Sequence, residues 1–170
     1  MLRRLIAAVV AALILTSSKS AWSINCGSLR FQTQDEVDAV GDALENCGSD
    51  DVGPFDNVGV VTIGPSTDIT NLDSLAAIES IEVSLSIRDN DALTDLGGLA
   101  NLTNVGTNVV ISGNAVLGSL SGLHKLTSIG GFLLITDNAA LGTLAGLDNI
   151  TTVNGRLEIA RNASLTSLDG

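Results

Sequence analysis

The chain has 170 residues and a formal net charge of −11, and 45% of its residues are hydrophobic. We expect no nucleic acid partner, because binding to a phosphate backbone requires an excess of Lys and Arg. Aromatic residues make up 2% and tyrosine is absent, so we also expect neither a platform for base stacking nor a large sugar-binding cleft.

Residues 1–23 are typical of an export signal. Two arginines precede an uninterrupted apolar run over residues 5–15, and a polar stretch follows that ends at Ser23. The run is too short to cross a bilayer, so we expect no membrane span in this chain. Cleavage is expected after Ser23, with Ser20 as the alternative. The mature chain then carries five basic and 19 acidic residues, and we expect it to be secreted or at the cell surface, in the periplasm or cell wall if the host is bacterial.

Residues 24–57 are predicted to form an N-terminal cap made of a strand, a helix and a loop. Residues 33–36, Thr-Gln-Asp-Glu, match a capping box, which marks the start of a helix. Apolar residues follow at helical spacing, at Val37, Val40 and Leu44. We expect this helix to cover the first coil of the repeat array, because a bare parallel sheet edge promotes aggregation.

Cys26 and Cys47 are the two cysteines of the chain, and an even pair in an exported protein is most simply a disulfide. The bridge would close a loop of about 20 residues around the helix and stabilise the fold by roughly 3 kcal/mol on chain-entropy grounds. Two cysteines and one distant histidine are a poor ligand set for zinc. We therefore predict a disulfide-stapled cap, no metal site and no cofactor.

From residue 58 to residue 170 the chain repeats a pattern of 24 residues. An apolar-x-apolar pair, such as Leu85-x-Ile87, is typical of a short strand with both side chains on one face. Leucines and a glycine follow at fixed offsets. The pattern predicts a stack of about four and a half coils whose parallel strands pair with each other, so that stability depends on neighbouring coils. Each repeat carries one asparagine at the same position: Asn90, Asn114, Asn138 and Asn162.

The asparagine column has two interpretations. Asparagine tolerates left-handed backbone, satisfies turn amides and can form hydrogen bonds between stacked side chains, which favours a structural ladder. A metal-binding or catalytic role is the alternative. The acidic neighbour does not repeat, because Asp89 is replaced by Gly113 and then by Asp137. We therefore interpret the column as structural.

The strand alternation predicts one candidate binding surface. Val110, Phe132 and Leu134 are expected to point away from the core on adjacent strands, with Arg88 and Arg156 beside them. Contiguous exposed apolar patches on soluble proteins are often contact sites. The alternatives are that a loop or further repeats cover these residues, or that they are ordinary scattered surface residues.

The sequence offers little support for a catalytic site. The single histidine, His124, occupies a repeat position held by Ala100 and Asp148 in neighbouring coils, so we expect it to be exposed rather than paired with a nucleophile. Among the predicted outward strand positions Glu158 is the one acid, whereas glycosidases use pairs of carboxylates. We predict that the chain is not an enzyme.

Several features together resemble the receptor L-domain family: Cys26 before a strand, a helix beginning Gln-Asp-Glu-Val, a second cysteine, and copies of Leu-Thr-Ser-Ile-Gly-Gly-x-Leu-x-Ile-x-x-Asn-x-x-Leu-x-x-Leu-x-Gly-Leu. The match is clearest over residues 126–147 and covers nearly all of the mature chain, although residues 48–57 are longer and more acidic than the family pattern. The resemblance implies a right-handed parallel β-helix related to leucine-rich repeats, as in receptor ectodomains and in fungal and bacterial surface proteins.

The expected fold is therefore mainly β, an L-domain-like right-handed β-solenoid with a disulfide-stapled N-terminal capping helix. The expected function is an exported binding module that presents a sheet face to a protein or glycan ligand. A structural spacer in a wall or adhesin protein is the alternative, and a polysaccharide-acting β-helix enzyme ranks below both. Gly170 falls part-way through a coil, so we also expect further repeats or a self-associating C-terminal edge.

Overall fold

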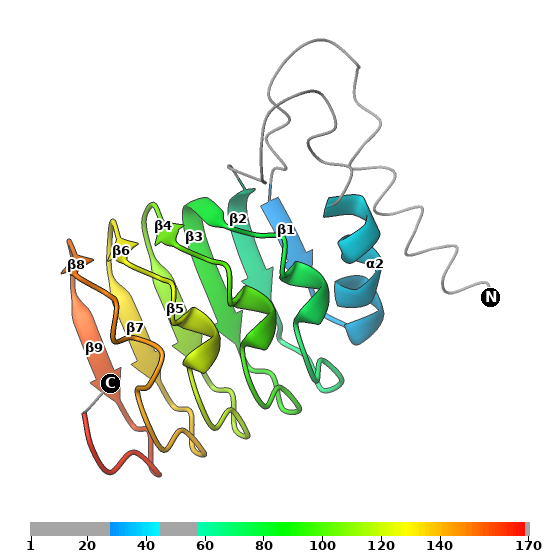
Figure 1. The fold of residues 1–170 in the computed structure, drawn as a ribbon. Coiled ribbons are helices and arrows are strands. Elements are labelled where there is room, and N and C mark those ends of the chain that lie inside the picture. Colours follow the sequence, from blue (N-terminus) through cyan, green and yellow to red (C-terminus); the bar gives the residue numbers. More distant parts are fainter. Residues whose placement is uncertain (1–27, 45–57, 169–170) are drawn as a thin grey trace.

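The computed structural model describes residues 28–44 and 58–168. The predicted export signal and both cysteines of the predicted disulfide lie outside the described residues. Within them the chain is mainly β, and its parallel strands form a solenoid of about four turns (Figure 1). The mainly β solenoid predicted from the 24-residue repeat is thus confirmed.

The coils of β3 and β5 pass through a main strand, a 3-10 turn on the opposite side, and a short strand that leads into the next main strand (Figure 1). The coil of β2 leads from its 3-10 turn directly into the longer strand β3, and the coil of β7 reaches its short strand without a 3-10 turn. The main strands are β1 (Ser28–Phe31), β2 (Val58–Ile63), β3 (Ser80–Arg88), β5 (Val109–Ser112), β7 (Leu133–Thr136) and β9 (Leu157–Ala160). The 3-10 turns are η1 (Asp73–Leu75), η2 (Gly97–Leu99) and η3 (Ser121–Leu123). The short strands are β4 (Asn104–Val105), β6 (Ser128–Ile129) and β8 (Thr152–Val153).

Strand pairing follows the repeat without a shift from β3 onward. Leu85 pairs with Val109, Val109 with Leu133, and Leu133 with Leu157, always in parallel. The short strands β4, β6 and β8 stack on one another and on the first two residues of β3. Residues one repeat apart therefore occupy equivalent places in successive coils, as the periodicity predicted.

Glycines mark the bend between the short and main strands. A Cβ atom on Gly106 would lie 1.9 Å from the carbonyl oxygen of Glu82, and one on Gly130 would lie 2.0 Å from that of Gly106. Successive backbones thus approach too closely at this bend for a side chain. The short second strand of each coil was not predicted from the apolar spacing, because two residues are too few to show alternation.

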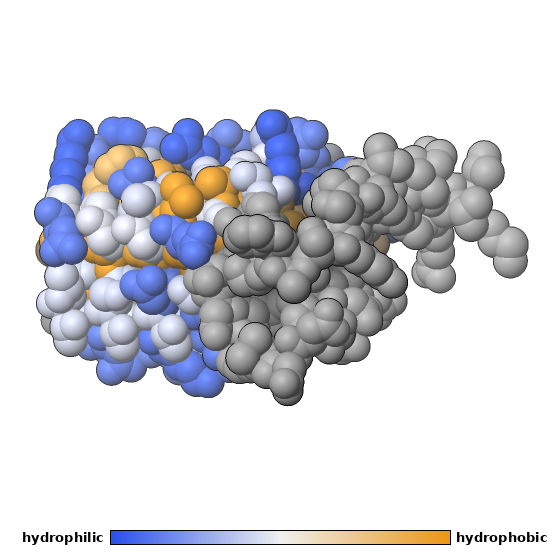
Figure 2. All heavy atoms as spheres, turned by 90° about the horizontal axis from the view of Figure 1, so that it is seen from above, coloured by the Kyte–Doolittle hydropathy of each residue, from blue (hydrophilic) through white to orange (hydrophobic). Residues whose placement is uncertain are grey.

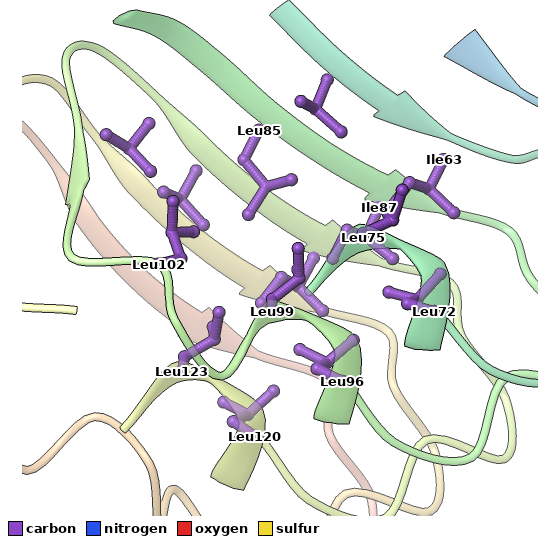
Figure 3. Close-up of a cluster of buried hydrophobic side chains, with 14 of the residues drawn as sticks. Ile63, Leu72, Leu75, Leu85, Ile87, Leu96, Leu99, Leu102, Leu120 and Leu123 are labelled. Carbon is purple, nitrogen blue, oxygen red and sulfur yellow. The ribbon is translucent and has the colours of Figure 1, made fainter. Parts of the chain in front are cut away.

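The core is built from the apolar columns of the repeat. Leu93, Leu117 and Leu141 are all completely buried, and Figure 3 shows leucines of the 3-10 turns and apolar residues of the strands pointing into the same interior. Each core layer is covered by the next coil. In the last described coil the same columns are accordingly more exposed, with Leu157 at 58% and Leu168 at 72%.

A column of short polar side chains starts the 3-10 side of every coil. One side-chain oxygen of each residue accepts a hydrogen bond, 2.8–3.1 Å long, from the backbone N–H two residues later. The residues are Asn71, Asp95, Ser119 and Thr143. Such turns are the local conformation that Asn, Asp, Ser and Thr favour. This column repeats every 24 residues but changes residue type, which is why the sequence alone did not reveal it.

The predicted capping helix is present as α2 (Gln34–Leu44). Thr33 Oγ1 accepts a hydrogen bond from the Glu36 N–H at 3.3 Å, and Val37 is completely buried. Gln34 Oε1 accepts hydrogen bonds from the N–H groups of Thr70 at 2.8 Å and Asn71 at 3.2 Å. The helix is thereby attached to the first coil, beside β1 and η1 (Figure 1).

Viewed from above, the described part of the stack has apolar patches interrupted by hydrophilic residues in its middle, and mostly hydrophilic residues along both long margins (Figure 2).

Candidate functional site

The candidate site is the outward side of the main strands, which we call the sheet face. From Ser84 to Arg88 in β3, and at the paired positions of the other main strands, inward core residues alternate with outward residues, and the register aligns the outward residues in rows along the stack. The sheet face consists of three such rows: Ser28, Val60, Ser84, Asn108, Phe132 and Arg156; Arg30, Thr62, Ser86, Val110, Leu134 and Glu158; Arg88, Ser112, Thr136 and Ala160.

The apolar part of the sheet face is less exposed than predicted. Phe132 and Leu134 are half-buried, and Val110 has only 6% of its surface exposed. The expectation that Val110 is an exposed contact residue is therefore wrong. Its short side chain lies between the rungs of Ser86 and Leu134, and strands only about 4.8 Å apart let neighbouring side chains cover it.

The two arginines predicted to flank the apolar residues differ from each other. Arg88 is exposed and makes no ion pair within residues 28–44 and 58–168. Arg156 Nη2 lies 2.8 Å from Glu158 Oε2, and these side chains are 72% and 27% exposed. The charge of Arg156 is thus balanced on the sheet face itself, whereas that of Arg88 is not.

The four asparagines form a hydrogen-bonded ladder along one corner of the solenoid. Each Nδ2 donates to the Oδ1 of the next asparagine, at 2.9 Å from Asn90 to Asn114, 3.0 Å from Asn114 to Asn138, and 3.3 Å from Asn138 to Asn162. The same Nδ2 atoms also donate to a backbone carbonyl oxygen, that of the last core residue in the main strand of the preceding coil. Asn114 Nδ2, for example, lies 3.1 Å from the carbonyl oxygen of Ile87. Asn90, Asn114 and Asn138 are completely buried.

The ladder has an unfilled acceptor at its first step. Asn90 Oδ1 is buried and has no hydrogen-bond partner among the described residues. Ser66 stands 24 residues before Asn90, but its hydroxyl donates to Asp68 Oδ1 at 2.8 Å. A serine therefore forms a local turn where an asparagine would have continued the ladder.

Left-handed backbone at this corner belongs to the residue before each asparagine rather than to the asparagine. The φ angles are 53° at Asp89, 71° at Gly113, 60° at Asp137 and 55° at Arg161. Arg161 binds Asp137 through two hydrogen bonds, of 2.6 and 2.8 Å. These bonds hold the pKa of the Asp137 carboxyl below its ordinary value, with a smaller contribution from Thr136.

Hydroxyl groups also link successive coils, which the sequence reading did not anticipate. Thr103, Thr127 and Thr151 each donate to the backbone carbonyl one repeat earlier, at 2.9–3.2 Å. On the sheet face, Ser112 and Thr136 hydroxyls lie 3.0 Å apart. The threonine column is visible at the 24-residue spacing, so a search for polar as well as apolar columns could have found it.

Groups with catalytic or metal-binding chemistry are dispersed. His124 is exposed, and its Nδ1 lies 2.9 Å from the carbonyl oxygen of Ser121 in its own coil. Among the described residues, no group of three or more His, Cys, Asp or Glu side chains could hold a metal ion. None of the helices in the described ranges has the length and apolarity needed to cross a membrane.

Comparisons of the chain with protein-family models, with curated proteins and with solved structures find no match.

Proposed function

We propose that this chain is an exported recognition module that binds a protein ligand on its sheet face, at the cell surface or outside the cell, and that it has no catalytic activity. The proposal includes the finer features expected from the sequence: cleavage of residues 1–23, a disulfide between Cys26 and Cys47, right-handed coils and membership of the receptor L-domain family.

The observation that carries the proposal is the composition of the sheet face. Its middle row changes from Arg30 through hydroxyl residues to Val110 and Leu134, and ends at Glu158. The core does not require this variety, because these side chains point away from it. Phe132 and Leu134 remain partly accessible beside polar groups, and apolar groups set among polar ones are typical of protein contact surfaces.

A protein ligand is favoured over a glycan by the same residues. Phe132 is the sole aromatic residue on the sheet face, and it is half-buried, whereas extended sugar sites depend on open aromatic surfaces. Leu134 and Phe132 together offer an aliphatic and aromatic contact of the kind that anchors protein interfaces.

The test is the double variant Phe132→Asp with Leu134→Lys, which keeps the net charge. Immobilised wild type and variant would be exposed to surface and secreted extracts, and to a glycan array. We expect ligand capture to be lost while the melting temperature changes by only about 3 °C, since both side chains are half-buried on the outward side of the strands and do not belong to the core. The matched control is Ala140→Asp with Val116→Lys, at exposed positions outside the sheet face.

Capture that survives the sheet-face variant would place the contact elsewhere. A chain that captures nothing in any form would instead support the structural spacer, and selective binding on the glycan array would replace the protein ligand by a glycan.

A further inference from the structure

The basic residues of this acidic chain gather on the sheet face. Outside residues 1–23 there are five, Arg30, Arg88, Lys125, Arg156 and Arg161, against 19 acidic residues in the whole chain. Three of the five, Arg30, Arg88 and Arg156, lie in the rows of the sheet face, where Glu158 is the one acid. The face is therefore positive while the molecule as a whole is negative.

The positive charge without an ion-pair partner among the described residues lies on the half of the face formed by β1, β2 and β3. Arg156 is paired with Glu158 at 2.8 Å. Arg30, on β1, and Arg88, at the end of β3, are both exposed, and neither forms an ion pair with any other described residue. The two basic residues outside the sheet face both have side-chain hydrogen-bond partners. Arg161 is bound to Asp137, and Lys125 Nζ donates to Asn101 Oδ1 at 2.8 Å.

We propose that the sheet face binds an acidic protein segment, whose carboxylates contact Arg30 and Arg88 and whose apolar residues contact Phe132 and Leu134. The inference rests on the proposed function and specifies the chemistry of its ligand. Charge complementarity selects the partner, because an acidic chain with net charge −11 repels another acidic molecule everywhere except at a locally positive surface.

The dimensions of the face suit a short segment. Arg30 and Arg88 are separated by two strand spacings across the sheet and by two residues along the strand, and the same separation holds between Arg88 and Leu134. At the usual spacing of strands and residues, the two Cα atoms of each pair are therefore about 12 Å apart. Three to four extended residues cover each step, at about 3.3 Å per residue. Hydroxyls of Ser86 and Thr62 lie between the arginines and can bind the backbone of the segment.

The probe is a synthetic nine-residue peptide with Glu and Asp at its first four positions, Ser at the fifth, and Leu and Phe in the remainder. The full chain, expressed with its own leader, is titrated against the labelled peptide by fluorescence anisotropy. A peptide with Lys in place of the acids and a polygalacturonate oligomer serve as comparison ligands. We expect the acidic peptide to bind, and added salt to weaken it, since exposed charge contacts are screened.

We expect Arg30→Gln with Arg88→Gln to weaken peptide binding about fivefold to tenfold, mainly through slower association, because each exposed charge contact contributes modestly to affinity and steers the encounter. Arg88→Gln alone is compared with Lys125→Gln, which removes one positive charge elsewhere and should leave binding within about twofold. Arg88→Lys should restore most of the affinity lost in Arg88→Gln.

Three results would overturn the inference. The first is equal binding of the acidic peptide by the wild type and the Arg30/Arg88 double variant, and the second is no binding of that peptide at all. The third is tighter binding of polygalacturonate than of the peptide, which would assign the face to an anionic glycan. If Phe132→Asp with Leu134→Lys abolishes capture of the natural ligand while the arginine variants do not, the recognition role stands and the acidic partner does not.

Discussion

Along the asparagine ladder and at the turn glycines, successive coils contact each other through the same residue types, whereas on the sheet face each strand differs from the next. Asn114 and Gly122 have equivalents in the neighbouring coils, and their neighbours one coil away are backbone groups or identical side chains. By contrast, one row of the sheet face contains basic, hydroxyl-bearing and aliphatic side chains, at Arg30, Ser86 and Leu134.

The difference shows which positions the stack constrains. Where a residue must form hydrogen bonds with, or pack closely against, the backbone of the neighbouring coil, the same residue type is needed in every coil and therefore recurs with the repeat. A side chain on the sheet face contacts its neighbours in the row only laterally, so its identity is free to serve recognition. Substitutions on the two sides should therefore affect different properties.

The largest expected effect is at the buried corner. Asn114→Ala removes two acceptor contacts, from Asn90 N at 3.2 Å and Asn90 Nδ2 at 2.9 Å, and two donor contacts. Several buried polar groups would lose their partners, so we expect a loss of about 3–5 kcal/mol in the free energy of unfolding. Chemical denaturation monitored by circular dichroism would measure it.

The matched control is Asn108→Ala on the sheet face of the same coil. Its side chain accepts one hydrogen bond, from Phe132 N at 3.1 Å, so about 1 kcal/mol should be lost. Equal losses at both asparagines would show that the corner is not specially constrained.

A smaller effect is expected at the 3-10 turns. A Cβ atom on Gly122 would lie 1.9 Å from the carbonyl oxygen of Leu96, a backbone atom, whereas one on Gly118 would meet no atom within 4 Å. Gly122→Ala should therefore force neighbouring coils apart and cost about 2–3 kcal/mol. Gly118→Ala should remain within about 0.5 kcal/mol of wild type. Differential scanning calorimetry of the two variants side by side gives the comparison, and a tolerated Gly122→Ala would mean that the coils are not packed this closely.

The smallest effect concerns the exposed pair of Asp137 and Arg161. The Arg161 hydrogen bonds lower the pKa of Asp137 from its ordinary value of 3.8 in the folded state, so folding favours the ionised carboxylate. The contribution of the Asp137 carboxylate to the stability of the folded state is present above the ordinary pKa of the group. It is lost as the pH falls through the lowered pKa of the folded state. The melting temperature of wild type should exceed that of Asp137→Asn by a few degrees or less at about pH 7, and the difference should shrink by about pH 3.

Arg161→Gln should show the same pH dependence as Asp137→Asn, because either change removes the pair. A difference between wild type and Asp137→Asn that grows on acidification would contradict the assigned direction of the shift.

The sequence by itself determined the stack, its register and its buried columns. A 24-residue spacing places Leu93, Leu117 and Leu141 in equivalent positions, and the apolar-x-apolar pairs locate the main strands, because periodicity acts directly on which side chains can be buried. The capping helix was equally predictable, because capping boxes act between near neighbours such as Thr33 and Glu36.

Only the tertiary structure decided which outward residues are accessible and which charges are balanced. Val110 and Leu134 alternate with the core in the same way, yet one is buried and the other is partly exposed, because accessibility depends on the side chains of both adjacent rungs. The pairing of Arg156 with Glu158, and the absence of such a pair at Arg88 among the described residues, likewise depends on side-chain positions that a repeat pattern does not specify.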